Sequence, residues 1–272
     1  MSTEASIVDN FKRLFYQADT YKLALTMSEA HPSLRQLRKY LFERFSQDFP
    51  DQDLAEVIRE EKLIYINKNC RYVPSQIKDF RGLTYLNLSN NPLQRLPPFI
   101  MQLQSLEFLA VGGCNLTFLP TSVRYLSRLR QFYLSENQIS TLPEEISELR
   151  SLEFLFLLNN ELSSLPKEIK QLRKLKSLTL ARNLFQEFPG MIPKMIHLEN
   201  LDMHGNMLTR LPDLTPLQSL SNLNLAKNNL TTIINQIKQL KALRVLSINE
   251  NAISLEELRA IEHTFPKCRV FM

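Results

Sequence analysis

An aspartate and a histidine two residues apart, Asp202 and His204, form the pair in this sequence best suited to acid–base or metal chemistry. Side chains two residues apart in an extended chain point to the same face, so the carboxylate and the imidazole could exchange a proton or hold a metal ion. The pattern places neither a third ligand nor a nucleophile beside them. We therefore interpret both as polar side chains of an exposed face, and we expect no enzymatic activity, no metal and no cofactor.

Other motifs for chemistry are missing from the sequence. The five glycines form neither GxxxxGK[ST] nor GxGxxG, and the four histidines form no HExxH. The cysteines Cys70, Cys114 and Cys268 are widely spaced without a CxxC pair, which predicts reduced thiols. No apolar run is long enough to span a membrane, and the first residues lack the features of a signal peptide. We expect a cytoplasmic protein without a membrane span.

Basic residues gather at one place in the chain, and Glu168 interrupts them. Aromatic residues that would stack on bases do not accompany this cluster, so we expect no nucleic-acid partner and interpret the cluster as a solvated surface. Its members are Lys167, Lys170, Arg173, Lys174 and Lys176.

The elements that position these residues follow from a repeat. Leucines recur every 23 residues, with one 22-residue unit beginning at Leu198. Each unit reads L-x-x-L-x-L-x-x-N-x-L and continues L-P-x-x-I-x-x-L. Alternating side chains of a short strand point to opposite faces, so the leucines enter a core, and no unit can bury them alone. The units begin at Leu83, Leu106, Leu129, Leu152, Leu175, Leu198, Leu220 and Leu243.

This pattern resembles the leucine-rich repeat family, in its 23-residue L-P-x-x-I subtype common in bacterial and intracellular signalling proteins. The resemblance implies an α/β solenoid: a curved horseshoe with a parallel concave sheet and a convex side of 3₁₀ or irregular turns. The proline of the L-P pair also disfavours long helices on the convex side. The family commonly serves as a protein-binding scaffold, so the resemblance implies a non-catalytic binding protein.

We predict three regions. Residues 1–59 form a helical cap, with a last helix that begins after Asp51 and carries Ile58 inward; a separate interaction domain is the alternative. Residues 60–254 hold the repeats, the first one degenerate because Lys68 replaces the asparagine. Residues 255–272 form a capping helix and strand. Ser254 and Glu257 form a capping box at the start of this helix, and Leu255 is the first residue of its inward face.

The outward positions of the strands predict the binding site. Each of the first four full repeats has an aromatic residue at one or both of these positions, and none of the last four has one. Because neighbouring strands lie about 4.8 Å apart, the aromatic residues form one patch, and large apolar patches mark interaction sites. The predicted partner-binding residues are Tyr85, Phe108, Tyr133, Phe154, Phe156 and Leu158, with a secondary polar face of Thr179, Asp202, His204 and Asn224.

The patch allows several occupants. We expect a protein or peptide ligand, with a glycan- or lipid-recognition module as the alternative and a metal-dependent enzyme using Asp202 and His204 as a third reading. Self-association through the aromatic patch, or coverage by the helical cap, would also bury it. Phe154 and Phe156 lie outside the predicted core, so we expect their truncation to leave the fold intact, with Thr179 as a matched polar control.

Overall fold

A computed structural model of the chain describes residues 58–59, 62–64, 66–67, 69, 71–73, 77–78 and 81–272. The chain divides into two compact units, residues 1–32 and 33–272, and all described elements belong to the second. Residues 1–57 of the helical cap predicted for residues 1–59 lie outside the described residues, as does the degenerate position Lys68.

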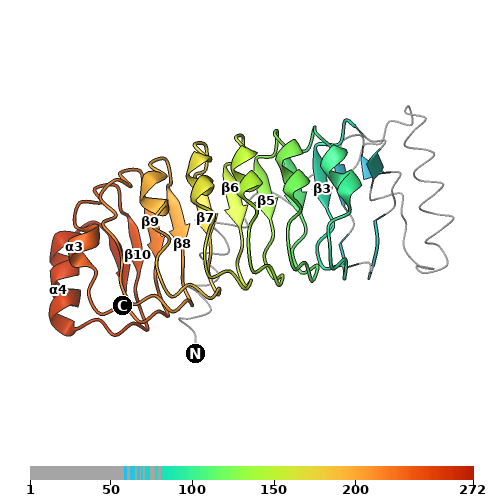
Figure 1. Ribbon diagram of the computed structural model, residues 1–272. Coiled ribbons are helices and arrows are strands. Elements are labelled where there is room, and N and C mark those ends of the chain that lie inside the picture. Colours follow the sequence, from blue (N-terminus) through green and yellow to red (C-terminus); the bar gives the residue numbers. More distant parts are fainter. Residues whose placement is uncertain are drawn as a thin grey trace. The chain divides into compact units, whose positions relative to one another are not determined.

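Eleven strands of the described chain form one sheet, in which every strand lies beside its neighbours in sequence (Figure 1). The first pair, β1 and β2, is antiparallel. The pairs from β2 to β11 are parallel. The strands are β1 Ile58–Arg59, β2 Lys62–Ile64, β3 Tyr85–Asn87, β4 Phe108–Ala110, β5 Gln131–Tyr133, β6 Phe154–Phe156, β7 Ser177–Thr179, β8 Asn200–Asp202, β9 Asn222–Asn224, β10 Val245–Ser247 and β11 Arg269–Phe271.

The predicted register is confirmed. The central apolar residue of each full repeat, a leucine in all but one and Phe132 in that one, pairs with its equivalent in the next, as Leu155 does with Leu178. Both side chains are fully buried, so the residues on either side of them occupy the opposite sheet face. We call that outward face, from β3 to β10, the concave face.

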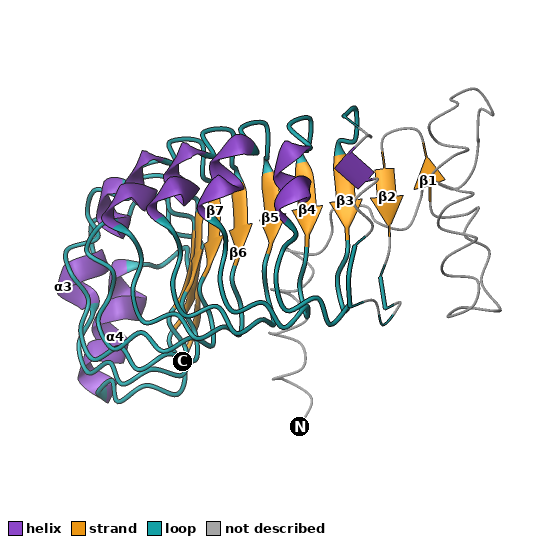
Figure 2. Ribbon diagram, turned by 45° about the vertical axis from the view of Figure 1, so that its right-hand side comes forward, coloured by secondary structure: helices purple, strands orange, loops and turns teal. Residues whose placement is uncertain are grey.

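Short helices form a second layer across the core from the strands (Figure 2). Four of them follow a proline whose φ lies between −61° and −70°, which fixes the backbone for the turn. The repeat that lacks this proline forms a single α-helical turn, α3. The helices are η3 Pro98–Gln102, η4 Thr121–Tyr125, η5 Glu144–Glu148, η6 Lys167–Gln171, η7 Ile192–Lys194, α3 Ile234–Ile237 and α4 Leu255–Thr264.

A ladder of asparagine side chains joins each repeat to the one before it. The Asn160 amide nitrogen donates to the carbonyl of Leu134 in the preceding repeat at 3.0 Å and to Leu157 in its own at 3.2 Å. Its oxygen accepts from the backbone nitrogen of Ile139 at 3.1 Å. These backbone groups are buried, where an unpaired donor or acceptor is costly. Equivalent contacts to both repeats are made by Asn137, Asn183, Asn206, Asn228 and Asn251.

Cys114 takes the place of asparagine in one repeat. Its thiol donates to the carbonyl of Leu88 at 3.2 Å, so it bridges the two repeats with a weaker donor. Burial raises the pKa of the Cys114 thiol to about 11, and the backbone hydrogen bonds lower it only in part. The thiol is therefore neutral at neutral pH and unsuited to nucleophilic chemistry.

The C-terminal cap differs from its predicted contacts in two ways. Ser254 accepts from the Glu257 nitrogen at 3.2 Å as expected, but the Glu257 carboxylate does not close a capping box. It accepts instead from the backbone nitrogens of Ile233 and Ile234, at 2.7 and 2.8 Å, because the start of α3 leaves these donors without an intrahelical partner. Leu255 is 74% exposed rather than inward, and Ile261 is the buried anchor of α4.

The prediction of helix through Ile58 is wrong. Ile58 and Arg59 form β1, which pairs with Leu63 and Lys62 of β2. The strand supplies hydrogen-bond partners for the edge of β2, which would otherwise be unpaired.

Replacing Leu155 by alanine tests the core register. We expect a loss of about 2–5 kcal/mol in the free energy of unfolding, since the substitution opens a cavity in a fully buried site. Urea denaturation measures the loss. An unfolding curve identical to that of the wild type would contradict the assigned register.

Replacing Asn160 by alanine tests the ladder. The substitution leaves the Ile139 N–H buried without its partner, while the carbonyls of Leu134 and Leu157 each keep one donor, from Asn137 and Asn183. We therefore expect a loss of about 1–3 kcal/mol in the free energy of unfolding. Asn229→Ala is the matched control, because that side chain is exposed and should change stability by less than about 0.5 kcal/mol. Equal effects of the two substitutions in thermal unfolding would show that the ladder contributes nothing.

Thiol labelling tests the state of Cys114. Because its pKa is raised to about 11, we expect iodoacetamide to modify Cys114 slowly in the folded protein and rapidly after unfolding, as followed by peptide mapping. A Cys114→Ser variant identifies the modified peptide. Rapid labelling of the folded protein at neutral pH would contradict a buried, protonated thiol.

Candidate functional site

Four aromatic rings form a continuous row on the concave face, one from each of the strands β3 to β6. The ring centroids of Tyr85 and Phe108 are 4.0 Å apart with an interplanar angle of 7°. Those of Phe108 and Tyr133 are 5.0 Å apart at 37°, and those of Tyr133 and Phe156 are 4.4 Å apart at 17°. We call these four residues the aromatic row.

The aromatic residues switch from the first to the second outward position of their strands halfway along the row. Tyr85 and Phe108 occupy the first outward position of their strands and pair in register, whereas Tyr133 and Phe156 occupy the second. The diagonal contact between Phe108 and Tyr133 is possible because Ala110, which lies opposite Tyr133, is small. Diagonal neighbours in a sheet lie within reach of aromatic side chains. The Tyr133 hydroxyl also donates to Gln131 at 3.2 Å, which draws Gln131 into the site.

Burial within the row differs from the sequence expectation. Tyr85, Phe108 and Tyr133 are half-buried, but Phe156 is only 6% exposed. Each ring covers the face of the next, and Phe156 lies between the Tyr133 ring and Thr179 of β7. Phe156 is therefore more buried than the sequence pattern predicts. We expect its truncation to reduce stability, because stacked aromatic pairs contribute about 0.5–1.5 kcal/mol beyond their buried area.

Phe154 and Leu158 lie beside the row and are both half-buried. Phe154 pairs in register with Gln131 and Ser177, and no described aromatic ring stacks on it. At the other end of the row, burial raises the pKa of the Tyr85 phenol, and a hydrogen bond from Asn87 opposes the shift. The tyrosine hydroxyl is therefore neutral at neutral pH, and the row carries no charge.

Polar residues continue the concave face in β7 to β9. The Nδ1 atom of His204 lies 3.0 Å from an Asp202 carboxylate oxygen, which also accepts from the His204 backbone nitrogen at 3.1 Å. Asn224 approaches the same ring nitrogen at 3.4 Å. The structure therefore brings together three of the four predicted polar-face residues, and the imidazole Nε2 has no partner among the described residues.

The fourth polar-face residue, Thr179, is nearly buried and cannot serve as an exposed control. It pairs with Asp202 in register, and its hydroxyl is buried without a hydrogen-bond partner, like those of Ser177 and Ser247. The outward positions of β7 are closed in by their neighbours, which the sequence pattern could not show. Buried hydroxyls without partners are uncommon, and all three belong to strands of the concave face.

Neither a metal-binding cluster nor a membrane-spanning helix occurs among the described residues. There, no group of three histidine, cysteine, aspartate or glutamate side chains could hold a metal ion. No described helix is long and apolar enough to cross a membrane. The cytoplasmic location expected from the sequence stays a prediction.

Several solved structures are similar to this chain. A leucine-rich repeat protein of Leptospira interrogans is 28% identical over 73% of this chain and 74% of its own, with a TM-score of 0.43. The ectodomain of the Arabidopsis thaliana receptor kinase GASSHO1/SCHENGEN3, solved in complex with CASPARIAN STRIP INTEGRITY FACTOR 2, is 28% identical over 71% of this chain, with a TM-score of 0.62. The plant peptide hormone receptor RGFR1, solved in complex with RGF2, is 23% identical over 66% of this chain, with a TM-score of 0.54.

The two plant receptors are much longer than this chain, which spans 24% of the first and 34% of the second. A comparison with curated protein sequences gives no significant match. The L-P-x-x-I subtype and a bacterial source stay predictions.

The family profile described as a leucine-rich repeat region matches residues 39–160, 122–210 and 152–265. Together these matches run from residue 39 to residue 265, well over half of the chain. The chain therefore belongs to the leucine-rich repeat family.

Proposed function

We propose that this protein is a non-catalytic scaffold whose concave face binds an extended segment of a partner protein. The observation that carries the proposal is the aromatic row across four adjacent strands, with Phe154 beside it and polar groups directly after it. Contiguous apolar surface with a polar border is typical of protein-binding sites.

The way the rings stack favours a protein over a glycan. Aromatic residues that bind sugars offer an open ring face, whereas the faces of Tyr85, Phe108 and Tyr133 lie against neighbouring rings at 4.0 to 5.0 Å. The row therefore offers ring edges and half-buried side-chain surface. Such surface suits the aliphatic and aromatic side chains of a peptide.

The polar part of the concave face suits peptide backbone groups. His204 keeps Nδ1 toward Asp202, so Nε2 is the atom available to a ligand. Asp202 is 5% exposed and holds the ring orientation through the contact with Nδ1. The same carboxylate oxygen accepts from the His204 backbone nitrogen. An imidazole fixed in this way costs little side-chain entropy when it binds an amide group.

The comparison with GASSHO1/SCHENGEN3 supports the class of function. That ectodomain was solved in complex with a binding factor, and it is 28% identical to this chain with a TM-score of 0.62. Because this chain spans 24% of its length, the comparison supports only the class of function, a leucine-rich repeat protein that forms a complex, and the identity of the ligand is not carried over.

Replacing Phe154 by alanine tests the proposal. We expect peptides selected from a random phage-displayed library on the full chain to lose at least about tenfold in affinity, which equals about 1.4 kcal/mol and is typical of an aromatic anchor. Stability should change little compared with Phe156→Ala, because no described ring stacks on Phe154. Fluorescence polarisation measures the binding and thermal unfolding measures the stability.

Phe118→Ala is the matched control, because Phe118 is 51% exposed and lies outside the strands. It should leave binding of the selected peptides unchanged. If Phe118→Ala weakens binding and Phe154→Ala does not, the concave face is not the binding surface. Sedimentation of the wild type and Phe154→Ala then tests self-association: a dimer lost in the variant would make a second copy the occupant of the patch.

A further inference from the structure

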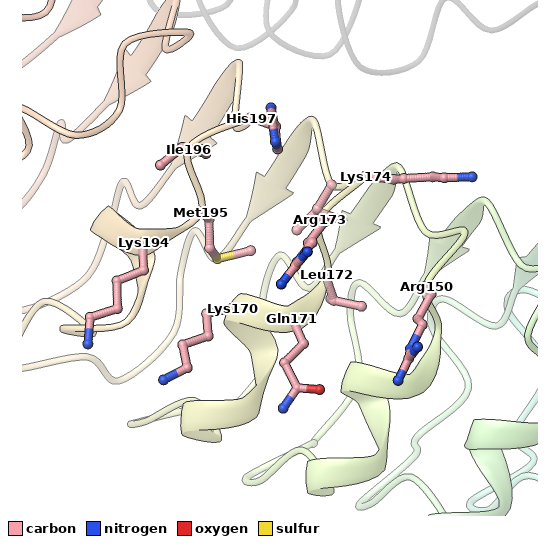
Figure 3. A pocket seen from close by; sticks show the side chains of 11 residues that line it. Arg150, Lys170, Gln171, Leu172, Arg173, Lys174, Lys194, Met195, Ile196 and His197 are labelled. Atoms are coloured by element: carbon pink, nitrogen blue, oxygen red, sulfur yellow. The ribbon is translucent and has the colours of Figure 1, made fainter.

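A second surface lies away from the concave face, where three successive repeats enter β6, β7 and β8. It is a groove of about 760 Å³. Figure 3 shows its lining side chains arranged around Leu172 and Met195. Leu172 and Met195 are buried and form an apolar floor, and Ile196 at the rim is 51% exposed.

Five of the side chains that line the groove are cationic, and none is a carboxylate. They are exposed, and none forms an ion pair with a carboxylate of the described residues. The formal net charge of the whole chain is +5, so a charge as large as the net excess is concentrated here. The five are Arg150, Lys170, Arg173, Lys174 and Lys194.

Neighbouring cations outside the groove are different, because carboxylates neutralise them. Glu153 binds Arg130 at 2.7 Å and Lys176 at 3.2 Å. Lys167 lies 3.8 Å from Glu168. The sequence cluster is thus divided in the structure: Lys167 and Lys176 are paired and stay outside the groove, while Arg150 and Lys194 join it from the adjacent repeats.

We propose that this groove binds an extended acidic peptide segment that carries an apolar residue next to its acidic run. Charge complementarity supplies the acidic requirement. The buried floor and the exposed Ile196 supply the apolar requirement. A groove of this volume lies within the range of ligand pockets, about 300–1,000 Å³, and is much larger than a single phosphate needs.

The repeat determines the order in which a bound peptide segment meets the residues of the groove. Arg150, Arg173 and Ile196 occupy the same position in three consecutive repeats, 23 residues apart, so they follow one another along the sheet direction. A segment running in that direction meets two cations and then an apolar side chain. The partner segment therefore carries its apolar residue at one end of the acidic run.

Nucleic acid fits this groove less well than a peptide. Proteins that bind single strands stack bases on aromatic side chains, and the groove lining contains no phenylalanine, tyrosine or tryptophan. Its single ring is the imidazole of His197. A membrane surface also fits less well, because the cations surround a hollow.

The test uses the full chain and a fluorescein-labelled peptide with a run of glutamates followed by leucine. We expect saturable binding that weakens as salt is raised, and a loss of at least about tenfold in Arg173→Glu/Lys174→Glu, since that double variant reverses two attractive charges. Lys238→Glu/Lys241→Glu is the matched control. Lys241 occupies the position of Arg173 three repeats later and does not line the groove.

Further binding measurements distinguish between the possible ligands of the groove. Replacing the leucine of the peptide by serine should weaken binding to the wild type but not to an Ile196→Ser variant, which would confirm the apolar contact. Equal losses in both double variants would overturn the proposal, because binding would then depend on net charge alone. Tighter binding of a single-stranded RNA or of phosphatidylserine vesicles, also lost in Arg173→Glu/Lys174→Glu, would overturn the peptide assignment.

Discussion

Every repeat depends on its neighbour for the hydrogen bonds of buried backbone groups. The Asn183 side chain, for example, donates to Leu157 of the preceding repeat and accepts from Leu162. A repeat shifted by one residue would leave these groups unpaired and would turn its leucines outward. The ladder and the leucine core therefore enforce the same register, and that register determines which side chains lie next to each other on both proposed surfaces.

The fixed register explains how much could be predicted from the sequence. A period of 23 residues aligns Tyr85 with Phe108 and Thr179 with Asp202, and both pairs are in register in the sheet. The backbone follows the repeat closely because each unit has the same core contacts to satisfy. The strands, the proline turns and the existence of an aromatic patch could therefore be derived by counting residues.

Side-chain packing between repeats could not be derived in this way. The step from Phe108 to Tyr133 depends on the small size of Ala110, and the burial of Phe156 depends on rings that cover one another. Glu257 contacts a helix start some twenty residues away rather than its own. The division of the basic cluster depends on Glu153, which neutralises Lys176 from an adjacent repeat. Each of these features is a contact that a side chain makes with another repeat, and the repeat pattern describes only positions within one.

The two proposed surfaces use the same periodicity for opposite purposes. On the concave face, residues one repeat apart lie close enough to stack, so aromatic side chains cover one another and form a continuous apolar row. At the groove, equivalent positions hold long cationic side chains that repel one another and extend into solvent. Stacking buries ring surface between neighbouring aromatic residues, whereas repulsion between the cationic side chains leaves their charges available to a ligand of opposite sign. Because different residues of the same repeats form the two surfaces, one solenoid segment can bind an apolar and an acidic segment of a partner without competition between them.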